Sequence, residues 1–354
     1  MKPGTQLELE ITAIAYGGAG VARHEGCVIF VPFTIPGEKV RARLSRVHRS
    51  WAQAALLEVL QPAPDRVEPP CPWFTRCGGC AYQHIAYPRQ LEIKTSQVAE
   101  ALRRIGKFTE PPVEPALASP LAYGYRNRIT VHVDPPAIGF RGTDPRELVD
   151  ITACLLADEE VNAALTRLRT KKFPHPGPAT LRSDPAGRGF RQVNDGAAEI
   201  LAALVANLAG AGELLVDAYC GAGFFAKKLR GAFTRIIGLE WDERSLAAAR
   251  ADLQPGEEYR AGDAAELLPA ALGEPASTVV LLDPPAQGLS PAIIGHLLTA
   301  RPARIVYVSC DPATLARDLA LLAPAFDLRR AAPVDMFPQT ASIETACLLT
   351  AKPD

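Results

Sequence analysis

The C-terminal half of the chain, from Ala197 onward, alternates short apolar strands with helices, and this alternation constrains the fold more than any other feature. Four runs have the length and β-branched content of buried strands, and each is followed by a helical stretch. Alternating β and α units of this length form a parallel sheet with helices on both faces. The expected strands are 214–217, 235–240, 278–283 and 304–309, and the expected helices are 197–208, 224–229, 244–253, 291–298 and 312–322.

These four strands all lead to a polar or reactive residue at the same end. Asp217, Glu240 and Asp283 end the first three strands, and Cys310 follows the fourth. Ligands of such sheets bind beyond the carboxyl ends of the strands, so we expect these side chains to line one site.

The turn after the first strand, Asp217-Ala-Tyr219-Cys-Gly221-Ala-Gly223, is rich in glycine. Glycine lets a cofactor approach the backbone, and Glu240, 19 residues after Gly221, stands where an acid accepts hydrogen bonds from ribose hydroxyls. Nicotinamide dinucleotides and S-adenosylmethionine both fit this pattern, so the turn alone does not choose between them.

The third strand ends in Asp283-Pro-Pro, a rigid turn that lacks two amide donors and presents a carboxylate and carbonyls to a pocket. Hydride transfer has no evident need for such a turn. Enzymes that methylate nitrogen or a base with S-adenosylmethionine often use one, so the turn favours methyl transfer.

Cys310 ends an apolar strand and precedes an expected helix that starts near Pro312. A helix N-terminus favours the thiolate, which makes this cysteine a candidate nucleophile, although Asp311 opposes the effect mildly. A lone buried cysteine is more often structural, but the shared rim with three acids favours a functional role.

The N-terminal half has a different pattern. Residues 1–62 form short strands with tight turns, which favours a small barrel of the OB type, and the proline-rich run 61–70 indicates a domain boundary. A helix is expected over 87–105 and paired strands over 125–134 and 137–140. Five basic residues without an acid form a stripe that could meet phosphate or be a solvated strand face. They are Lys39, Arg41, Arg43, Arg46 and Arg49.

Composition excludes several classes of protein. With 48% hydrophobic and 22% charged residues the chain can bury a core, and 38 basic against 39 acidic residues give no global sign of a polyanion partner. No apolar run approaches the roughly 18 residues of a membrane span, and the N-terminus lacks a signal peptide's apolar stretch. We expect a soluble cytoplasmic protein, and nothing requires more than a monomer.

The eight cysteines are unevenly placed. Cys71, Cys77 and Cys80 fall within ten residues, while the other five are scattered. Without a secretory signal, a disulfide framework is not expected, so a metal cluster or catalytic thiols are the better interpretation.

Ordered motifs over nearly all of the chain resemble the bacterial RNA 5-methyluridine methyltransferases. Within this family the chain resembles the 23S ribosomal RNA branch, which has an N-terminal TRAM domain and an iron–sulfur cluster. The TRAM-like segments are Gly18-Ala-Gly-Val-Ala-Arg, Val31-Pro and Pro36-Gly-Glu. The catalytic-domain motifs are Phe190-Arg-Gln-Val-Asn, the Asp217 turn, Asp283-Pro-Pro, Ser309-Cys-Asp-Pro and Asp335-Met-Phe-Pro with Glu344.

The resemblance implies S-adenosylmethionine-dependent methylation of uridine C5. Cys310 would add to C6 of uracil and make C5 electron-rich, and Glu344 would remove the C5 proton so that Cys310 can leave. Positions around the cofactor or the base would be Gln192, Tyr219, Glu240, Asp263 and Asp283, beside Asp217 and Gly221 of the glycine turn.

The resemblance also joins Cys154 to Cys71, Cys77 and Cys80 as the ligands of a [4Fe–4S] cluster. Four thiolates would accept zinc as well, and only the resemblance favours iron–sulfur. Methyl transfer needs no electron, so we expect a structural or RNA-folding role for the cluster.

Two departures from the family pattern bear on the substrate. The family usually has Arg after Asp-Pro-Pro, where this chain has Ala286, and often has His upstream of the base, where this chain has Thr340-Ala341-Ser342. Both changes remove groups that could contact RNA or support the site.

A uridine must leave its stack to reach Cys310, and single-stranded loops present such bases at least cost. Aromatic and Arg side chains can stack on a splayed base, so one segment of the central region is a candidate RNA contact. A plain strand with a solvated Arg face is the alternative. The candidates are Tyr123, Tyr125, Arg126, Asn127 and Arg128.

The sequence therefore predicts a multidomain α/β protein: an OB-like TRAM barrel (1–62), an α+β central domain with the cysteines (63–180), and a Rossmann-like doubly wound methyltransferase domain (181–354). TRAM and cluster together favour 23S ribosomal RNA over the tRNA T-loop, and no DNA or membrane partner is expected. A nicotinamide oxidoreductase with a relay cluster would leave Asp283-Pro-Pro and Cys310 without a role. A drifted, non-catalytic RNA-binding protein conflicts with the presence of Cys310 and Glu344.

Overall fold

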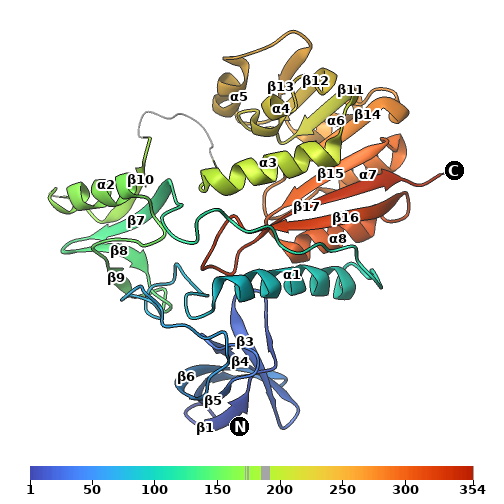
Figure 1. Ribbon diagram of the computed structural model, residues 1–354. Helices are drawn as coiled ribbons and strands as arrows, with labels where there is room; N and C mark the ends of the chain where they lie inside the picture. The colour runs from blue at the N-terminus through green and yellow to red at the C-terminus, as the bar shows by residue number, and fades with distance from the viewer. Residues whose placement is uncertain (172, 174, 185–191, 354) are drawn as a thin grey trace. The chain divides into compact units, whose positions relative to one another are not determined.

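The structure is a computed structural model that describes residues 1–171, 173, 175–184 and 192–353 (Figure 1). The chain divides into two compact units, and each unit combines segments that are distant in sequence. None of the helices in these ranges is long and apolar enough to span a membrane. Unit 1 comprises Met1–Ile93, Pro120–Pro185 and Phe337–Ser342, and unit 2 comprises Lys94–Ser119, Ala186–Met336 and Ile343–Asp354.

The first sheet of unit 1 has the strand order β1-β5-β6-β4-β3-β2. Alternation along β5 buries Val40, Ala42 and Leu44 and turns the basic residues outward, as the sequence predicts. The sheet confirms the expected strand-rich TRAM region, and β2 is too short to leave a sequence signal. The strands are β1 (Gln6–Glu10), β2 (Ala13–Ile14), β3 (Ala19–His24), β4 (Cys27–Pro32), β5 (Lys39–Val47) and β6 (Trp51–Gln61).

The second sheet of unit 1 has the order β10-β7-β8-β9, and its neighbouring strands all pair antiparallel. Helix α2 packs its buried residues against this sheet, and Asp158 caps its N-terminus by accepting the Val161 amide hydrogen. The elements are β7 (Arg128–Asp134), β8 (Ala137–Arg141), β9 (Leu148–Asp150), α2 (Glu159–Arg169) and β10 (Gly177–Arg182).

Unit 2 is built on a seven-stranded sheet in the order β13-β12-β11-β14-β15-β17-β16. The first five strands are parallel, as expected, but β17 pairs antiparallel with both β15 and β16. Parallel strands need a long crossover, which the few residues between β16 and β17 cannot provide. The strands are β11 (Gly212–Ala218), β12 (Phe233–Glu240), β13 (Glu257–Ala261), β14 (Thr278–Leu282), β15 (Arg304–Ser309), β16 (Phe326–Val334) and β17 (Glu344–Ala351).

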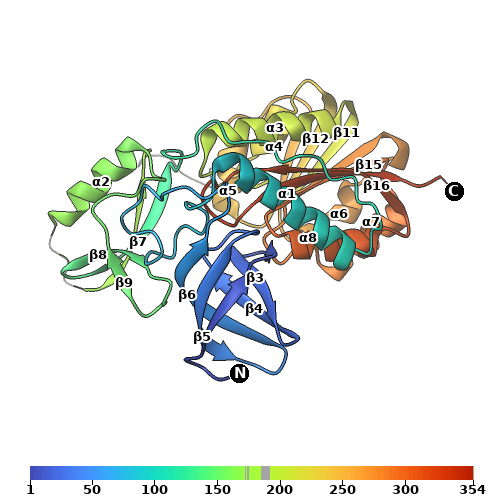
Figure 2. The same ribbon diagram turned by 60° about the horizontal axis from the view of Figure 1, so that its bottom comes forward.

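Helices cover both faces of this sheet, which Figure 2 shows nearly edge-on. Helices α6, α7 and α8 share a core with the sheet, together with Val98 and Leu102 from the second half of α1. Helix α3 contacts β15, β16 and β17 from the other face. The helices are α1 (Tyr87–Arg104), α3 (Asp195–Ala209), α4 (Phe224–Lys228), α5 (Glu243–Arg250), α6 (Ala264–Ala271), α7 (Pro291–Ala300) and α8 (Pro312–Leu322), with a 3₁₀ turn over Pro275–Ser277.

Candidate active site

Strand register brings the two predicted catalytic residues together. In the antiparallel pair of β15 and β17, Ser309 lies opposite Thr345. The next position places Cys310, directly after β15, beside Glu344, the first residue of β17. Asp283 follows the neighbouring strand β14, and the charges of Glu344 and Asp283 both act on the Cys310 thiol.

The Cys310 thiol is not activated in the way the sequence indicated. Cys310 precedes α8, and Asp311 caps that helix through a 2.7 Å hydrogen bond from the Thr314 amide. Burial, followed by the negative charges of Glu344 and Asp283, nevertheless raises the pKa of Cys310 to about 11. The expected lowering by the helix N-terminus is therefore wrong, because desolvation and two carboxylates outweigh it.

Three carboxyl groups on this rim, those of buried Asp217 and Glu344 and of half-buried Asp283, have no basic partner among the described residues. Burial and the charge of Asp283 raise the pKa of Glu344 well above its ordinary range, and burial raises the pKa of Asp283 to about 7. The pKa of Asp217 rises in the same way, through burial and then the charges of Asp283 and Glu240. The rim therefore has a negative potential that a bound cation would relieve.

The glycine turn after β11 adopts left-handed backbone at several positions. Tyr219, Gly221 and Gly223 have φ angles of 69°, 55° and 78°, which glycine tolerates and tyrosine does not favour. The Gly221 amide donates a 3.0 Å hydrogen bond to Glu240, which also accepts from the Asp242 amide at 2.9 Å. Glu240 thus fixes the turn, and its two carboxylate oxygens can each accept a further hydrogen bond. By contrast, neither oxygen of Asp217 has a hydrogen-bond partner of normal geometry within the described part of the chain.

Two predicted cofactor residues lie outside this buried group. Asp263 is exposed and caps α6 through a 2.8 Å hydrogen bond from the Ala265 amide, although its charge reaches Tyr219. Gln192 is partly buried and precedes α3, which Asn194 caps. Phe190 and Arg191 of the same motif lie outside the described residues.

Sequence reasoning missed the group that holds the loop after Asp283-Pro-Pro. Asp318 of α8 is fully buried and accepts hydrogen bonds from the Tyr307 hydroxyl at 2.7 Å and the Leu289 amide at 2.8 Å. The adjacent Arg317 donates to the Gln287 carbonyl at 2.8 Å. A guanidinium from α8 therefore lies near the loop whose own position 286 is an exposed alanine. The one sequence signal for this contact was Asp318 itself, an acid on the apolar face of an expected helix.

A buried ion pair in unit 2 was also missed. Lys94 Nζ lies 2.6 Å from Asp335 Oδ1, and both side chains are fully buried. Asp335 follows β16 directly, one position past Val334, which pairs with Glu344. The Asp335-Met-Phe-Pro motif marked one partner, but nothing in the sequence marked Lys94.

In unit 1, the four predicted cysteine ligands meet around one cavity of about 70 Å³. Burial raises the pKa of Cys77 and Cys154, and it raises the pKa of Cys80 to about 12. As they stand, no three His, Cys, Asp or Glu side chains in the described part of the chain are arranged to hold a metal ion. The thiols nonetheless converge, and a metal centre would have to supply the positive charge that keeps them deprotonated.

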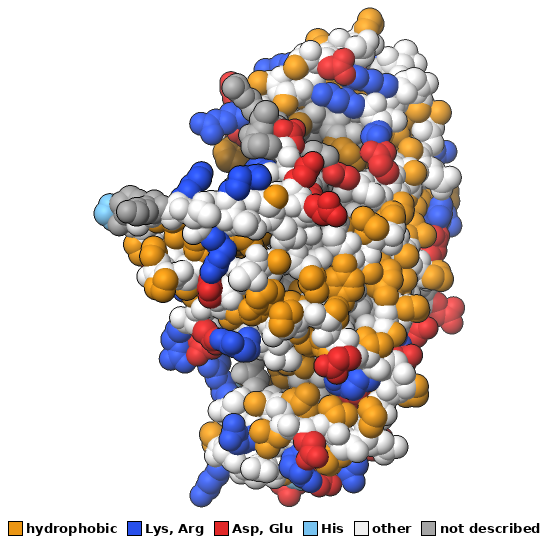
Figure 3. Space-filling model, turned by 60° about the vertical axis from the view of Figure 1, so that its left-hand side comes forward, with side chains coloured by type: hydrophobic (Ala, Val, Ile, Leu, Met, Phe, Trp, Pro, Cys, Tyr) orange, Lys and Arg blue, Asp and Glu red, His pale blue; other side chains and the backbone are white. Residues whose placement is uncertain are grey.

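Some residues of the predicted basic stripe form ion pairs with acidic residues on neighbouring strands. Arg41 donates to Glu58 at 2.6 Å and to Glu8 at 3.1 Å, and Lys39 also pairs with Glu8. On the face that Figure 3 shows, Lys and Arg side chains are likewise mixed with acidic ones. Arg43, Arg46 and Arg49 are exposed and form no ion pair with the described residues, so they carry the unneutralised part of the stripe.

Known protein families and individual proteins match this chain. The family model described as tRNA (Uracil-5-)-methyltransferase matches residues 267–352, and the TRAM domain model matches residues 1–57. An RNA methyltransferase of Synechocystis is 31% identical over 98% of this chain and 96% of its own length. Another, of Gloeobacter violaceus, is 33% identical over 98% and 96%.

A solved structure shares the fold over both units. The Pyrococcus abyssi tRNA (uracil-54, C5)-methyltransferase, in complex with S-adenosyl-L-homocysteine, has a TM-score of 0.75 and 24% identity. The match covers 97% of this chain and 100% of that chain. At this identity the likeness supports the architecture described above.

Proposed function

Because this chain belongs to the TRAM-containing family of RNA uracil-5-methyltransferases, we propose that it methylates uridine C5 in structured RNA through a covalent Cys310 adduct. The observation that carries the proposal is the proximity of Cys310 and Glu344. They lie one position beyond the paired residues Ser309 and Thr345, and the charge of Glu344 acts on the Cys310 thiol. Asp283 adds a second carboxyl group, and its charge acts on both Cys310 and Glu344.

Cys310, whose pKa lies near 11, must first lose its proton to solvent water. The thiolate then adds to C6 of uracil, and the C5–C6 π electrons form an enolate. C5 takes the methyl group as the S–CH3 bond of the donor breaks, and the donor's sulfur keeps the electron pair and leaves as a neutral thioether. Glu344 removes the proton from C5, the double bond re-forms and the C6–S bond breaks, which releases Cys310. Once its sulfur is bonded to carbon, Cys310 no longer carries a charge that opposes ionisation of Glu344.

The methyl donor fits the acidic end of the sheet. S-Adenosylmethionine bound there supplies an electrophilic methyl group together with positive charge. The unpartnered oxygens of Asp217 can accept donors from such a ligand, and Glu240 can accept from ribose hydroxyls. A cation in this position would lower the pKa of Asp283 and Glu344 toward their ordinary ranges.

We also propose that Cys71, Cys77, Cys80 and Cys154 hold a [4Fe–4S] cluster. A single zinc ion needs all four sulfur atoms within about 2.3 Å of one point, whereas a cluster is larger and tolerates sulfurs set around a cavity. The aromatic side chains Trp73 and Phe74 line the cavity with the thiols and would exclude water from the cluster. No catalytic step described above uses an electron, so the proposed role is structural.

The proposed substrate is 23S ribosomal RNA, with the tRNA T-loop as the second candidate. TRAM and the cysteine set support the ribosomal choice, while the solved structure with the same fold belongs to a tRNA enzyme. The remaining alternative is an RNA-binding protein that has lost methyltransferase activity, and the first experiment distinguishes it from an active enzyme.

The protein, purified without oxygen, is incubated with methyl-labelled S-adenosylmethionine and unmodified transcripts of 23S RNA and tRNA. Digestion and nucleoside mass spectrometry then identify the product. We expect 5-methyluridine in the 23S transcript and a loss of at least about a thousandfold in Cys310→Ala. Cys347→Ala is the matched control, because Cys347 is buried on β17 of the same unit and has no role in the reaction.

Label in tRNA alone would replace the ribosomal assignment with the tRNA one. Label in neither RNA, with S-adenosylmethionine still bound, would contradict methyl transfer to these substrates and favour the drifted protein.

A further inference from the structure

Six residues of the chain belong to a different unit from their neighbours in sequence. Phe337–Ser342, here called the strap, packs with unit 1, whereas β16 before it and β17 after it belong to unit 2. Glu344 follows the strap by two residues. The backbone of the proposed general base is therefore tethered at short range to whatever holds the strap.

Gln339 at the centre of the strap is held in an unfavourable backbone conformation. Its φ angle is 69°, which a non-glycine residue rarely adopts, and its side chain is almost fully buried. A residue keeps this strained conformation only where several surrounding contacts hold it in place, and strained residues are common at functional sites.

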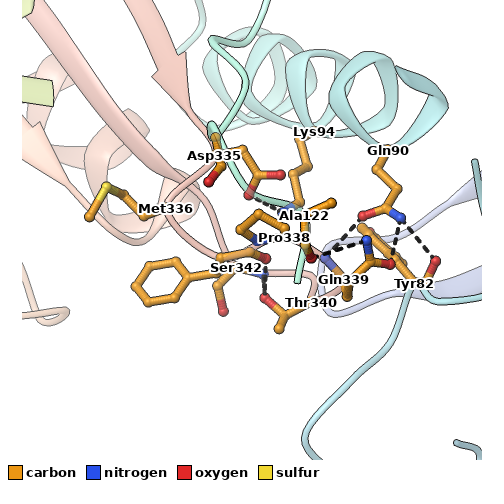
Figure 4. Close-up of polar contacts among 12 residues, drawn as sticks. Tyr82, Gln90, Lys94, Ala122, Asp335, Met336, Pro338, Gln339, Thr340 and Ser342 are labelled. Atoms are coloured by element: carbon orange, nitrogen blue, oxygen red, sulfur yellow. Dashed lines mark hydrogen bonds and ion pairs between the residues drawn. The ribbon is translucent and has the colours of Figure 1, made fainter. Parts of the chain in front are cut away.

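Those contacts account for each polar group of Gln339. Its amide and side chain form a reciprocal pair with Gln90 of α1: the Gln339 amide donates to Gln90 Oε1 at 3.1 Å, and Gln90 Nε2 donates to Gln339 Oε1 at 2.9 Å (Figure 4). Gln339 Nε2 reaches the Ala122 carbonyl at 3.5 Å. Gln90 Nε2 also donates to the Ile85 and Tyr82 carbonyls, so the pair is fixed from both sides.

The remaining group, the Gln339 carbonyl, accepts hydrogen bonds from the segment that follows Cys80. The amides of Ala81 and Tyr82, directly after Cys80, donate to it at 3.0 and 2.9 Å. A displacement of Cys80 would therefore act on Gln339 through one or two residues of backbone.

A second connection runs through Tyr125 and Arg126. The Tyr125 hydroxyl donates to the Pro338 carbonyl at 2.9 Å, and the Arg126 guanidinium lies 5.9 Å from the centre of the Phe337 ring. Arg126 also lines the cysteine cavity, and its amide donates to the Leu156 carbonyl at 2.7 Å, two residues after Cys154. The segment after Cys80 thus contacts the strap directly, and the segment after Cys154 is linked to it through Arg126.

We propose that the four cysteines around the cavity (Cys71, Cys77, Cys80 and Cys154), here called the cage, position the strap and through it Glu344. Gln339 and Gln90 are then positioning residues for proton removal from C5. This inference rests on the proposed function, because it concerns the step assigned to Glu344. The step most sensitive to the strap is then release of the Cys310 adduct, since attack by Cys310 precedes any use of the base.

The test compares Gln339→Ala and Gln339→Gly with Gln97→Ala, a buried glutamine on the same helix as Gln90 but outside the strap. Glycine accepts the φ angle of position 339, so the two Gln339 variants separate backbone strain from lost hydrogen bonds. Each protein reacts with S-adenosylmethionine and a 23S transcript containing uridine or 5-fluorouridine, and denaturing gels resolve the covalent protein–RNA adduct.

With 5-fluorouridine no C5 proton can be removed, so all variants should trap adduct as the wild type does. With uridine we expect both Gln339 variants to accumulate adduct and release it on the order of 10- to 100-fold more slowly, because small displacements of a catalytic group have effects of this size. Gln97→Ala should release it at the wild-type rate. Release by the Gln339 variants at the wild-type rate would overturn the inference while leaving the function intact, whereas no adduct from wild type with 5-fluorouridine would overturn the function itself.

The contribution of the cage has a readout that does not depend on activity. Hydrogen exchange of a peptide covering the strap is measured in Cys80→Ser and in Cys27→Ser, a cysteine buried in the core of the first sheet of unit 1. We expect at least about tenfold faster exchange of strap amides in Cys80→Ser only. Equal protection in the two variants would show that the cage does not hold the strap.

Discussion

Unit 2 buries charge in two opposite ways. At the rim, Asp217, Asp283 and Glu344 are desolvated without a basic partner in the described part of the chain, and the pKa of each is raised. Beside the sheet, Lys94 and Asp335 are both fully buried, and their charged atoms lie 2.6 Å apart. Both partners of the ion pair come from within unit 2, so the fold itself satisfies that charge.

The difference separates two uses of a buried acid. A paired acid has its charge satisfied by the fold and contributes to one defined structure, whereas an unpaired group costs stability that a ligand can restore. The rim therefore has the electrostatics of a binding site for a cation, and the Lys94–Asp335 pair has those of a structural element. The same contrast recurs on the surface of β5, where Arg41 is paired with acids and Arg43 is not.

The largest expected effect on stability is at the paired site. Lys94→Met leaves Asp335 buried without its partner, so we expect the free energy of unfolding in urea to fall by about 3–5 kcal/mol. The double variant Lys94→Met/Asp335→Leu removes both charges and should recover most of this loss. A single variant as stable as the wild type would show that the pair is not the structural element described here.

At the rim, removing a charge should raise the free energy of unfolding instead of lowering it. The pKa of Asp283 is about 7 in the folded protein and near 3.8 when unfolded, so the folded state binds the extra proton between these values. Stability from this group is therefore fully present below pH 3.8 and lost as the pH rises through 7. Asp283→Asn should be as stable as wild type below pH 3.8. At pH 8 it should be more stable by roughly 2 kcal/mol, since solvent screens part of the charge of this half-buried carboxyl.

Thermal unfolding of the ligand-free protein across this pH range checks the sign. Asp242→Asn is the matched control: hydrogen bonds from Ser245 lower the pKa of Asp242, so the substitution should destabilise at pH 8. Destabilisation by both substitutions would remove the distinction between rim and paired carboxylates.

The smallest effect is expected on the surface. If the unpaired arginines of the stripe meet RNA phosphates, Arg43→Ala/Arg46→Ala/Arg49→Ala should weaken binding of single-stranded RNA and lower the slope of log affinity against log salt by about 2. Lys39→Ala/Arg41→Ala, whose charges are already paired with Glu8 and Glu58, should change the slope less. Fluorescence anisotropy at several salt concentrations measures both, and equal slopes would contradict the assignment.

Local pattern was sufficient for the regular part of the molecule. Apolar runs predicted β11, β12, β14 and β15, and the rule for parallel sheets predicted that Asp217, Glu240 and Asp283 share one rim. A strand beginning near Glu344 was expected, but β16 and its antiparallel pairing with β17 were not, because β16 contains Arg329 and Arg330 and lacks a clean period.

The remaining features depend on partners that no local pattern reveals. Lys94 and Asp335, or Gln90 and Gln339, are separated by more than two hundred residues and meet only in the folded chain. Cys154 joins the other cysteines for the same reason, and only the family resemblance predicted it. The pKa of Cys310 was mispredicted because the helix N-terminus is visible in the sequence and the two acids across the sheet are not.

The pKa of Cys310 tests the central claim most directly. Rates of iodoacetamide alkylation at Cys310, followed by peptide mass spectrometry over a range of pH, give this value with and without S-adenosylmethionine. The account predicts a pKa near 11 in the ligand-free protein, a lower pKa in Asp283→Asn, and a lower pKa when the cationic methyl donor binds. A ligand-free pKa at or below the ordinary thiol value, unchanged by Asp283→Asn, would contradict the claim that unpartnered carboxyls control the nucleophile.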